Sequence, residues 1–217
     1  MKNLVPSLYV LETTDFNISN DILDMLPTER QIRINKAIKI EKAKQLYASS
    51  LLLGYILDKY GKKFDDIKLL ESGKPYIKDG PYFNVSHSGK YVVIAVDLED
   101  IGVDIQEKTT VSEAAAKMFL GDDSDLNMAL RNEYYHSYIW CRKEAFLKCL
   151  GVGWNGKRES KVSILCNKIE YNASSYFLTD YFVSEDYFLT LCEKNEHKDF
   201  AIEEVSKLEL EIFYRSG

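Results

Sequence analysis

The sequence lacks the features that define several classes of protein. Its 217 residues include only three histidines and four cysteines, and no two cysteines have the C-x-x-C spacing of a zinc site. No run approaches the ~20 apolar residues of a membrane-spanning helix, and the N-terminus lacks the apolar segment of a signal peptide. These absences favour reduced thiols, a cytoplasmic location and no membrane partner.

Positive charge is not in excess either. The chain has 28 Lys and Arg against 34 Asp and Glu, a formal net charge of −6, which argues against a general affinity for nucleic acid or anionic membranes. Hydrophobic residues make up 46% of the chain, enough to bury a substantial core. The composition therefore predicts a globular protein in which any basic site is local.

Helical and strand patterns follow one another along the chain. A strand is predicted over residues 8–14, and one long helix with a basic first half begins after Pro27. Residues 60–106 read as short strands and hairpins with a turn at 87–90, and residues 111–120 and 132–150 as helices. Further strands continue to the end. This order predicts an α+β fold with two related lobes, residues 1–105 and 106–217, and no flexible linker.

Asp104 stands in an unusual position for a carboxylate. It lies between Val103 and Ile105, shortly after the apolar run of residues 91–96. Considered alone, it is either an ordinary residue at a strand end or one ligand of a metal ion that needs partners from elsewhere.

A second informative stretch is "WCRKEAFLKCLGVG", residues 140–153. Helical spacing directs Trp140, Phe146, Leu147 and Leu150 toward a core, which leaves Lys143, Glu144 and Lys148 on a partly exposed face. Glu144 and Lys148 are four residues apart, so by themselves they are an ordinary helix-surface pair.

Four short sequence motifs, taken together and in their order along the chain, change the interpretation of Asp104 and Glu144. "GKP" at 73–75, "NVSHS" at 84–88, "GVDIQ" at 102–106 and "WCRKEAFLK" at 140–148 resemble the 4'-phosphopantetheinyl transferases of the larger, surfactin-synthetase-activating type. These enzymes share G-[IV]-D-[IV]-x, followed some 40 residues later by [FW]-x-x-K-E-[AS]-x-x-K, and Asp104 and Glu144 are 40 positions apart. The resemblance covers residues 25–155, including the basic helix.

The resemblance implies a fold of two α+β lobes that form a pseudo-dimer with the active site in the cleft between them, within a monomer. It also implies an activity, the transfer of the phosphopantetheine arm of coenzyme A to a serine of an apo acyl, peptidyl or aryl carrier protein. Adenosine 3',5'-bisphosphate is released, and the activated carrier serves fatty acid or secondary metabolite biosynthesis. The cofactor implied is Mg²⁺, with Mn²⁺ as a substitute, and no nucleic acid partner is expected.

Several residues match positions of the family motifs, and the resemblance implies a role for each of them. Asp104, Glu144 and Lys148 are the expected catalytic residues, and Asp104 and Glu144 the expected metal ligands. The expected contacts with coenzyme A are Arg30, Arg33, Lys44, Lys74, Pro75, Ser86, His87, Lys143 and Lys148. Glu144 also has the chemistry of a general base for the carrier serine, either directly or through a water.

One position departs from the pattern, because many relatives have a third carboxylate where this chain has Gln106. Strand alternation places residues 104 and 106 on one face, so we expect Gln106, or a water, to complete the metal shell. Two rival functions remain: a non-catalytic module that binds coenzyme A or a carrier protein, and a metal-dependent phosphohydrolase. Residues 114–120 either line the carrier groove or form an amphipathic helix packed on the second lobe.

Overall fold

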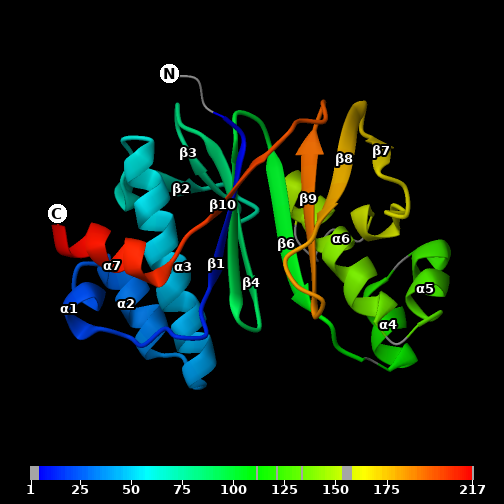
Figure 1. The fold of residues 1–217 in the computed structure, drawn as a ribbon. Coiled ribbons are helices and arrows are strands. Elements are labelled where there is room, and N and C mark those ends of the chain that lie inside the picture. The colour runs from blue at the N-terminus through cyan, green and yellow to red at the C-terminus, as the bar shows by residue number, and fades with distance from the viewer. Residues whose placement is uncertain (1–4, 111, 121, 133, 153–157, 217) are drawn as a thin grey trace.

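The computed structural model describes residues 5–110, 112–120, 122–132, 134–152 and 158–216. Two four-stranded sheets face each other at the centre, and helices cover their outer faces (Figure 1). The α+β class expected from the sequence is confirmed.

The first sheet belongs to the N-terminal lobe and has the order β10-β1-β5-β4. Its strands are β1 (Ser7–Glu12), β4 (Tyr82–Ser88), β5 (Tyr91–Asp97) and β10 (Ala201–Glu204). Helices α1 (Asn20–Leu23), α2 (Thr28–Asn35), α3 (Ile40–Lys59) and α7 (Lys207–Ser216) lie on its outer side. A small hairpin of β2 (Ile67–Leu69) and β3 (Pro75–Ile77) completes the lobe.

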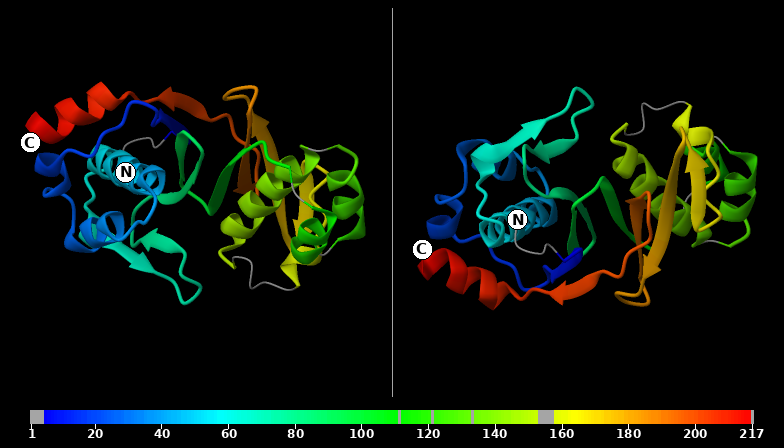
Figure 2. Two further views of the ribbon diagram at one scale, coloured as in Figure 1. Left: turned by 90° about the horizontal axis from the view of Figure 1, so that it is seen from below. Right: turned by 90° about the horizontal axis from the view of Figure 1, so that it is seen from above.

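The second sheet has the order β6-β9-β8-β7 and is antiparallel throughout. It consists of β6 (Ile101–Glu107), β7 (Lys168–Tyr171), β8 (Ser174–Tyr181) and β9 (Tyr187–Lys194). Helix α6 (Tyr135–Leu150) packs on its outer face, flanked by α4 (Glu113–Phe119) and α5 (Asp123–Ala129). Figure 2 shows β10 and α7 along one side of the two sheets and the β2–β3 hairpin on the other.

Strand β5 explains why the run of residues 91–96 is apolar without interruption. Tyr91, Val93 and Ala95 point into the core between the two sheets. Val92, Ile94 and Val96 point into the core between the first sheet and its helices. A strand that is buried on both faces needs apolar residues at every position, not at alternate ones.

Several boundaries differ from the sequence predictions. The second lobe begins at β6, not at residue 106, and residues 201–216 return to the N-terminal lobe, where β10 pairs with β1 and α7 packs near α3. The division into residues 1–105 and 106–217 stays a prediction, and the strand pairing groups residues 101–105 and 201–204 differently. The C-terminal residues also end in a helix, α7, where strands were expected.

The expected long basic helix is two helices. Residues 36–39 separate α2 from α3, and Lys39 has an extended backbone with φ −93° and ψ 133°. Ile38 fits the helical period of this segment, and in the structure it is fully exposed in the turn. Between the two helices predicted in this region lies a further helix, α5, whose N-cap Asp122 accepts hydrogen bonds from the backbone N–H groups of Ser124 and Asp125. Residue 111 lies outside the described residues, and the predicted helix at 111–120 is present as α4.

Candidate active site

Helix α6 lies unusually close to strand β6, and a glycine makes this possible. A Cβ atom at Gly102 would lie 2.1 Å from the Ala145 carbonyl oxygen and 2.4 Å from the Cys149 nitrogen. On the same face of β6, the Cys141 thiol donates to the Asp104 carbonyl oxygen at 3.1 Å. The glycine before Val-Asp therefore lets the helix that carries Glu144 pack directly on the strand that carries Asp104.

The two acidic residues of the sequence motifs meet at one ammonium group. Lys148 Nζ lies 2.6 Å from Asp104 Oδ1 and 4.0 Å from Glu144 Oε2. Ser86 donates its hydroxyl proton to the same Asp104 oxygen at 2.6 Å. The other oxygen, Asp104 Oδ2, is buried and has no hydrogen-bond partner among the described residues. A buried carboxylate oxygen without a partner retains the capacity to accept a further cation or hydrogen-bond donor.

Strand β4 holds β6 across the junction of the lobes without belonging to its sheet. Asn84 Oδ1 accepts from the Val103 N–H at 3.0 Å, and Ser88 Oγ accepts from the Glu107 N–H at 3.0 Å. Between them, Ser86 Oγ accepts from the Ile105 N–H at 3.4 Å. Alternate side chains of "NVSHS" thus satisfy the exposed edge of β6 and fix the register of the two lobes around Asp104.

A pocket of about 250 Å³ lies on the N-terminal side of this junction. Four residues expected to contact coenzyme A share its wall, namely Arg30, Arg33, Pro75 and His87. Helices α2 and α3 supply the two arginines and the neighbouring Ser49 and Ser50, and β4 supplies His87. Arg30 donates to the Ser50 hydroxyl at 3.3 Å and stacks on the Phe64 ring at 4.6 Å, so its guanidinium is held in place.

The imidazole of His87 has a cationic environment. Burial lowers its pKa, and the nearby ammonium groups of Lys42 and Lys148 lower it further. Its Nε2 lies 3.1 Å from Lys42 Nζ, a distance that suits a neutral ring accepting a hydrogen bond from the ammonium group. Burial and Arg33 in turn lower the pKa of Lys42. This part of the site attracts anions.

Lys143 does not lie on the exposed face that helical spacing suggested. Its ammonium group is fully buried, 2.6 Å from Asp125 Oδ2, and it donates to the carbonyl oxygens of Ser160 and Val162. These partners join α6 to α5 and to the segment before β7. The lysine before Glu144 is thus engaged inside the C-terminal lobe, and its expected contact with coenzyme A is not supported.

Lys74 and Lys44 also lie apart from the pocket of Arg30 and His87. Lys74 donates to Asp100 Oδ1 at 3.0 Å and to the Cys149 carbonyl oxygen at 2.8 Å, which ties the β2–β3 hairpin to the end of α6. Lys44 lines a different pocket, with Gln45 and Lys90. The structure therefore brings together only part of the predicted set for coenzyme A.

Gln106 lies two residues beyond Asp104 on β6 and is half-buried. Because β6 remains a regular strand to Glu107, alternation places Gln106 on the α6 face together with Asp104. Its amide donates only a long hydrogen bond, 3.4 Å, to the Glu107 carbonyl oxygen. Glu107 itself is exposed.

Sequence reasoning missed three residues of this region. Lys42 was visible only as one of many basic residues on a helix, and Asn84 only as part of a motif. Arg142 lies within the second motif, and its guanidinium is buried and bonded to Asp180 and to the carbonyl oxygens of Ile164 and Cys166. No local signal separates these side chains from surface residues, because their partners lie far away in the sequence.

Comparisons with known proteins identify the family of the chain. A model described as 4'-phosphopantetheinyl transferase, N-terminal, matches residues 12–99, and one described as 4'-phosphopantetheinyl transferase superfamily matches residues 100–203. The 4'-phosphopantetheinyl transferase ffp of Bacillus subtilis is 35% identical over 58% of this chain and 64% of its own. The 4'-phosphopantetheinyl transferase Sfp of Bacillus subtilis strain 168 is 33% identical over 67% of this chain and 68% of its own. A third Bacillus subtilis transferase is 31% identical over 79% of this chain and 87% of its own.

The chain belongs to the 4'-phosphopantetheinyl transferase superfamily. The matched part spans slightly less than two thirds of the ffp relative and most of the third relative. None of the helices in the described residues is long and apolar enough to cross a membrane.

Proposed function

We propose that this chain transfers the 4'-phosphopantetheine arm of coenzyme A to a serine of an apo carrier protein and releases adenosine 3',5'-bisphosphate. One observation carries the proposal. Asp104 and Glu144, 40 residues apart, meet at Lys148 beside a basic pocket that Arg30, Arg33 and His87 line. Two carboxylates next to an anion-binding pocket suit a reaction that must neutralise a diphosphate and deprotonate an alcohol.

The residues at the junction fit a magnesium ion. Asp104 Oδ2 is buried without a partner among the described residues, and Glu144 reaches toward the same ammonium group. Within the described residues, no group of three His, Cys, Asp or Glu side chains could hold a metal ion. Magnesium is commonly held by one or two carboxylates, with phosphate oxygens and waters as the other ligands, and Mn²⁺ accepts the same ligands. When bound, the ion would neutralise charge on the diphosphate.

The protein groups would then share the remaining work. The serine hydroxyl of the carrier attacks the phosphorus nearer the pantetheine, and the bond from that phosphorus to the oxygen of the bisphosphate leaving group breaks. Lys148 would stabilise charge on the diphosphate, while Arg30, Arg33 and His87 would hold the phosphates of the adenosine half. Glu144 would take the serine proton. Ser86, whose hydroxyl bonds Asp104, would keep that carboxylate oriented.

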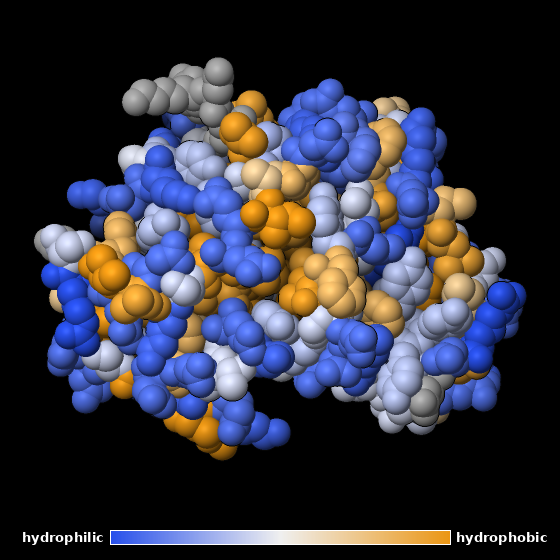
Figure 3. All heavy atoms as spheres, in the orientation of Figure 1, coloured by the Kyte–Doolittle hydropathy of each residue, from blue (hydrophilic) through white to orange (hydrophobic). Residues whose placement is uncertain are grey.

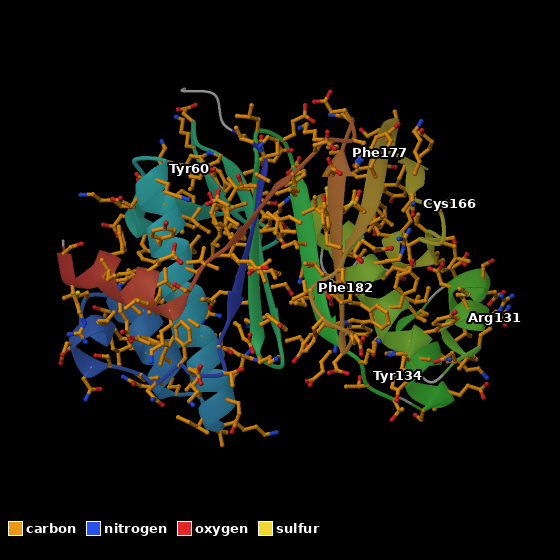
Figure 4. All side chains as sticks on the ribbon, viewed as in Figure 1. Tyr60, Arg131, Tyr134, Cys166, Phe177 and Phe182 are labelled. Carbon is orange, nitrogen blue, oxygen red and sulfur yellow. The ribbon has the colours of Figure 1, made fainter. Side chains whose placement is uncertain are left out.

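Both acidic residues and the basic pocket come from one chain, which supports a monomeric enzyme. All four cysteines are free and three are buried, which supports the proposed cytoplasmic setting. Cys166, the exposed one, lies on the outer side of the C-terminal lobe, away from the junction (Figure 4).

A mass measurement tests the proposed function. The protein is incubated with coenzyme A, Mg²⁺ and an unmodified acyl or peptidyl carrier protein, and the carrier is then weighed. Transfer adds the mass of one phosphopantetheine arm to the carrier. Tight coenzyme A binding without any gain, with several carriers, would instead indicate a binding module, and release of free phosphate would indicate a phosphohydrolase.

Replacing Gln106 with glutamate tests the metal site. We expect Gln106→Glu to keep transferase activity and to lower the magnesium concentration that gives half the maximal rate, because a carboxylate is a stronger magnesium ligand than an amide oxygen. Titration of the initial rate with Mg²⁺ at saturating coenzyme A measures this. An unchanged magnesium dependence would show that residue 106 does not lie at the metal.

A further inference from the structure

The last helix of the chain, α7, packs near α3 in the N-terminal lobe. Figure 3 shows hydrophilic and hydrophobic side chains mixed on its outer face, while Leu210 on its inner face is fully buried. Near the end of α7, Tyr214 reaches α3 and donates its hydroxyl proton to the Leu51 carbonyl oxygen at 3.1 Å. This tyrosine ties the C-terminal end of the chain to the helix that supplies one wall of the basic pocket.

Gly54 of α3 makes room for the Tyr214 hydroxyl. A Cβ atom at residue 54 would overlap the hydroxyl oxygen and would lie 3.1 Å from Cε2 of the Phe64 ring. The hydroxyl and the edge of the ring therefore meet above the same glycine. Because a glycine inside a helix is destabilising relative to alanine, the close approach of Tyr214 explains the residue at this position.

The Phe64 ring in turn supports Arg30 of the candidate active site. The guanidinium carbon of Arg30 lies 4.6 Å from the ring centroid, and the guanidinium donates to the Ser50 hydroxyl at 3.3 Å. Phe64 begins a short helical turn, in which the Asp66 carboxylate accepts a hydrogen bond from the Lys63 N–H at 2.8 Å. The turn fixes the backbone of the aromatic residue, and Tyr214 limits the position of its ring.

The Tyr214 hydroxyl stays protonated, so its contact is one of shape and not of charge. Burial raises the pKa of Tyr214, and the positive charge of Arg30 only partly opposes this rise. A neutral phenol leaves the charge of Arg30 available to an anion. A change in the volume beside the hydroxyl therefore tests the contact without changing the charge of the pocket.

Arg30 and His87 suit different phosphates of coenzyme A. After burial and Lys42, the charge of Lys148 is a further cause that lowers the pKa of His87, so the imidazole borders the reacting groups. The pKa of Arg30 is lowered by burial and by Arg33. Coenzyme A carries one phosphate outside its diphosphate, the 3'-phosphate of the ribose, and a guanidinium with two donors side by side matches this group.

We infer that Tyr214 is a positioning residue for the binding of coenzyme A. It holds the Phe64 ring, and the ring holds the Arg30 guanidinium where the 3'-phosphate binds, a role that rests on the proposed transferase function. A guanidinium that is already held in place loses less freedom when the anion binds, and so binds it more tightly. The C-terminal helix then contributes to substrate affinity through Phe64, without a contact of its own with the ligand.

A methyl group at residue 54 tests this role. Gly54→Ala places a carbon atom where the Tyr214 hydroxyl lies, and so displaces the hydroxyl and the Phe64 ring. Isothermal titration calorimetry without a carrier protein measures the binding of coenzyme A. We expect its Kd to rise about five- to tenfold, the range for a guanidinium that loses its aromatic support. The Kd for 3'-dephospho-coenzyme A, which lacks the phosphate in question, is expected to change less than about twofold.

Removing the hydroxyl makes room for the new methyl group. Tyr214→Phe alone leaves a gap beside the Phe64 ring and is expected to raise the Kd for coenzyme A about threefold. In the double variant the methyl group of Gly54→Ala fills this gap, so we expect a Kd within about twofold of wild type. A double variant that binds as weakly as Gly54→Ala alone overturns the role of Tyr214. Tyr171→Phe, which removes a hydroxyl bonded to Glu159 at 2.8 Å in the C-terminal lobe, is the matched control and leaves both Kd values unchanged.

The effect must pass through Arg30. In an Arg30→Ala background, Gly54→Ala is expected to cause no further loss of affinity, because residues that act as a unit do not contribute additively. A full additional loss in that background overturns the role of Tyr214. The melting temperature shows that each variant is folded, and if Gly54→Ala is not folded, Tyr214→Phe provides the same comparison.

Binding measured without turnover separates this role from the proposed function. If the wild-type protein binds coenzyme A but transfers no arm, and Gly54→Ala weakens binding as expected, the transferase activity fails and the role of Tyr214 stands. If the arm is transferred and folded Gly54→Ala keeps the wild-type Kd, the activity stands and the role of Tyr214 is overturned. Equal wild-type Kd values for coenzyme A and 3'-dephospho-coenzyme A overturn it as well, since Arg30 then holds no 3'-phosphate.

Discussion

Replacing Glu144 with glutamine is expected to lower turnover by about 10³-fold or more, the combined loss of a metal ligand and a general base. Glutamine keeps the size and shape of the side chain, which lies on α6 within 4.0 Å of Lys148. What it removes is the negative charge and the ability to accept a proton. The rate of carrier modification measures the loss, and the melting temperature shows that the fold is intact.

Two comparisons sharpen this experiment. Glu107→Gln removes an exposed carboxylate from the end of β6, three residues from Asp104, and is expected to leave turnover nearly unchanged. Asp104→Asn is expected to be as damaging as Glu144→Gln, and the double variant little worse than either one, because residues that act as a unit do not contribute additively. Near-normal turnover of Glu144→Gln would remove Glu144 from the catalytic group.

The meeting of Asp104 and Glu144 was predicted through the resemblance to a family, because local patterns alone left Asp104 an ordinary strand residue and Glu144 an ordinary residue of a helix surface; the structure shows what brings them together. Alternation along β6 places Asp104 on the α6 side, Gly102 allows close packing, and the i, i+4 spacing puts Glu144 beside Lys148. The residue types then restrict the chemistry. Arg30, Arg33 and His87 were predicted only through the resemblance to a family, and the structure shows that they share one pocket.

Local sequence patterns could not predict which strands pair when they lie far apart in the sequence. The Ser7 and Ala201 pair of β1 and β10 joins the two ends of the chain, and nothing in either short segment indicates its partner. The division between α2 and α3 was hidden because Ile38 fits a helical period although it is exposed in the turn. Periodicity predicts which residues share a face, and it does not show whether a neighbouring element covers that face.

Lys143 is the residue whose assignment changes most. Sequence reasoning placed it with coenzyme A, whereas the structure pairs it with Asp125, with both side chains fully buried. We expect Lys143→Met to lower the free energy of unfolding by about 3–5 kcal/mol, because it leaves the Asp125 carboxylate buried without its cation. Equilibrium unfolding in urea measures this loss.

The double variant Lys143→Met with Asp125→Leu is expected to recover much of that stability, since no uncompensated charge remains in the interior. Recovery is incomplete because Asp125 also accepts hydrogen bonds from the Ser163 hydroxyl and the Ile164 N–H. Lys148→Met provides the opposite pattern. Its side chain is 24% exposed, and Asp104 keeps its hydrogen bond from the Ser86 hydroxyl when Lys148 is replaced, so we expect turnover to fall far more than stability. If Lys143→Met instead raised the KM for coenzyme A and left the unfolding free energy unchanged, Lys143 would belong to the coenzyme A site after all.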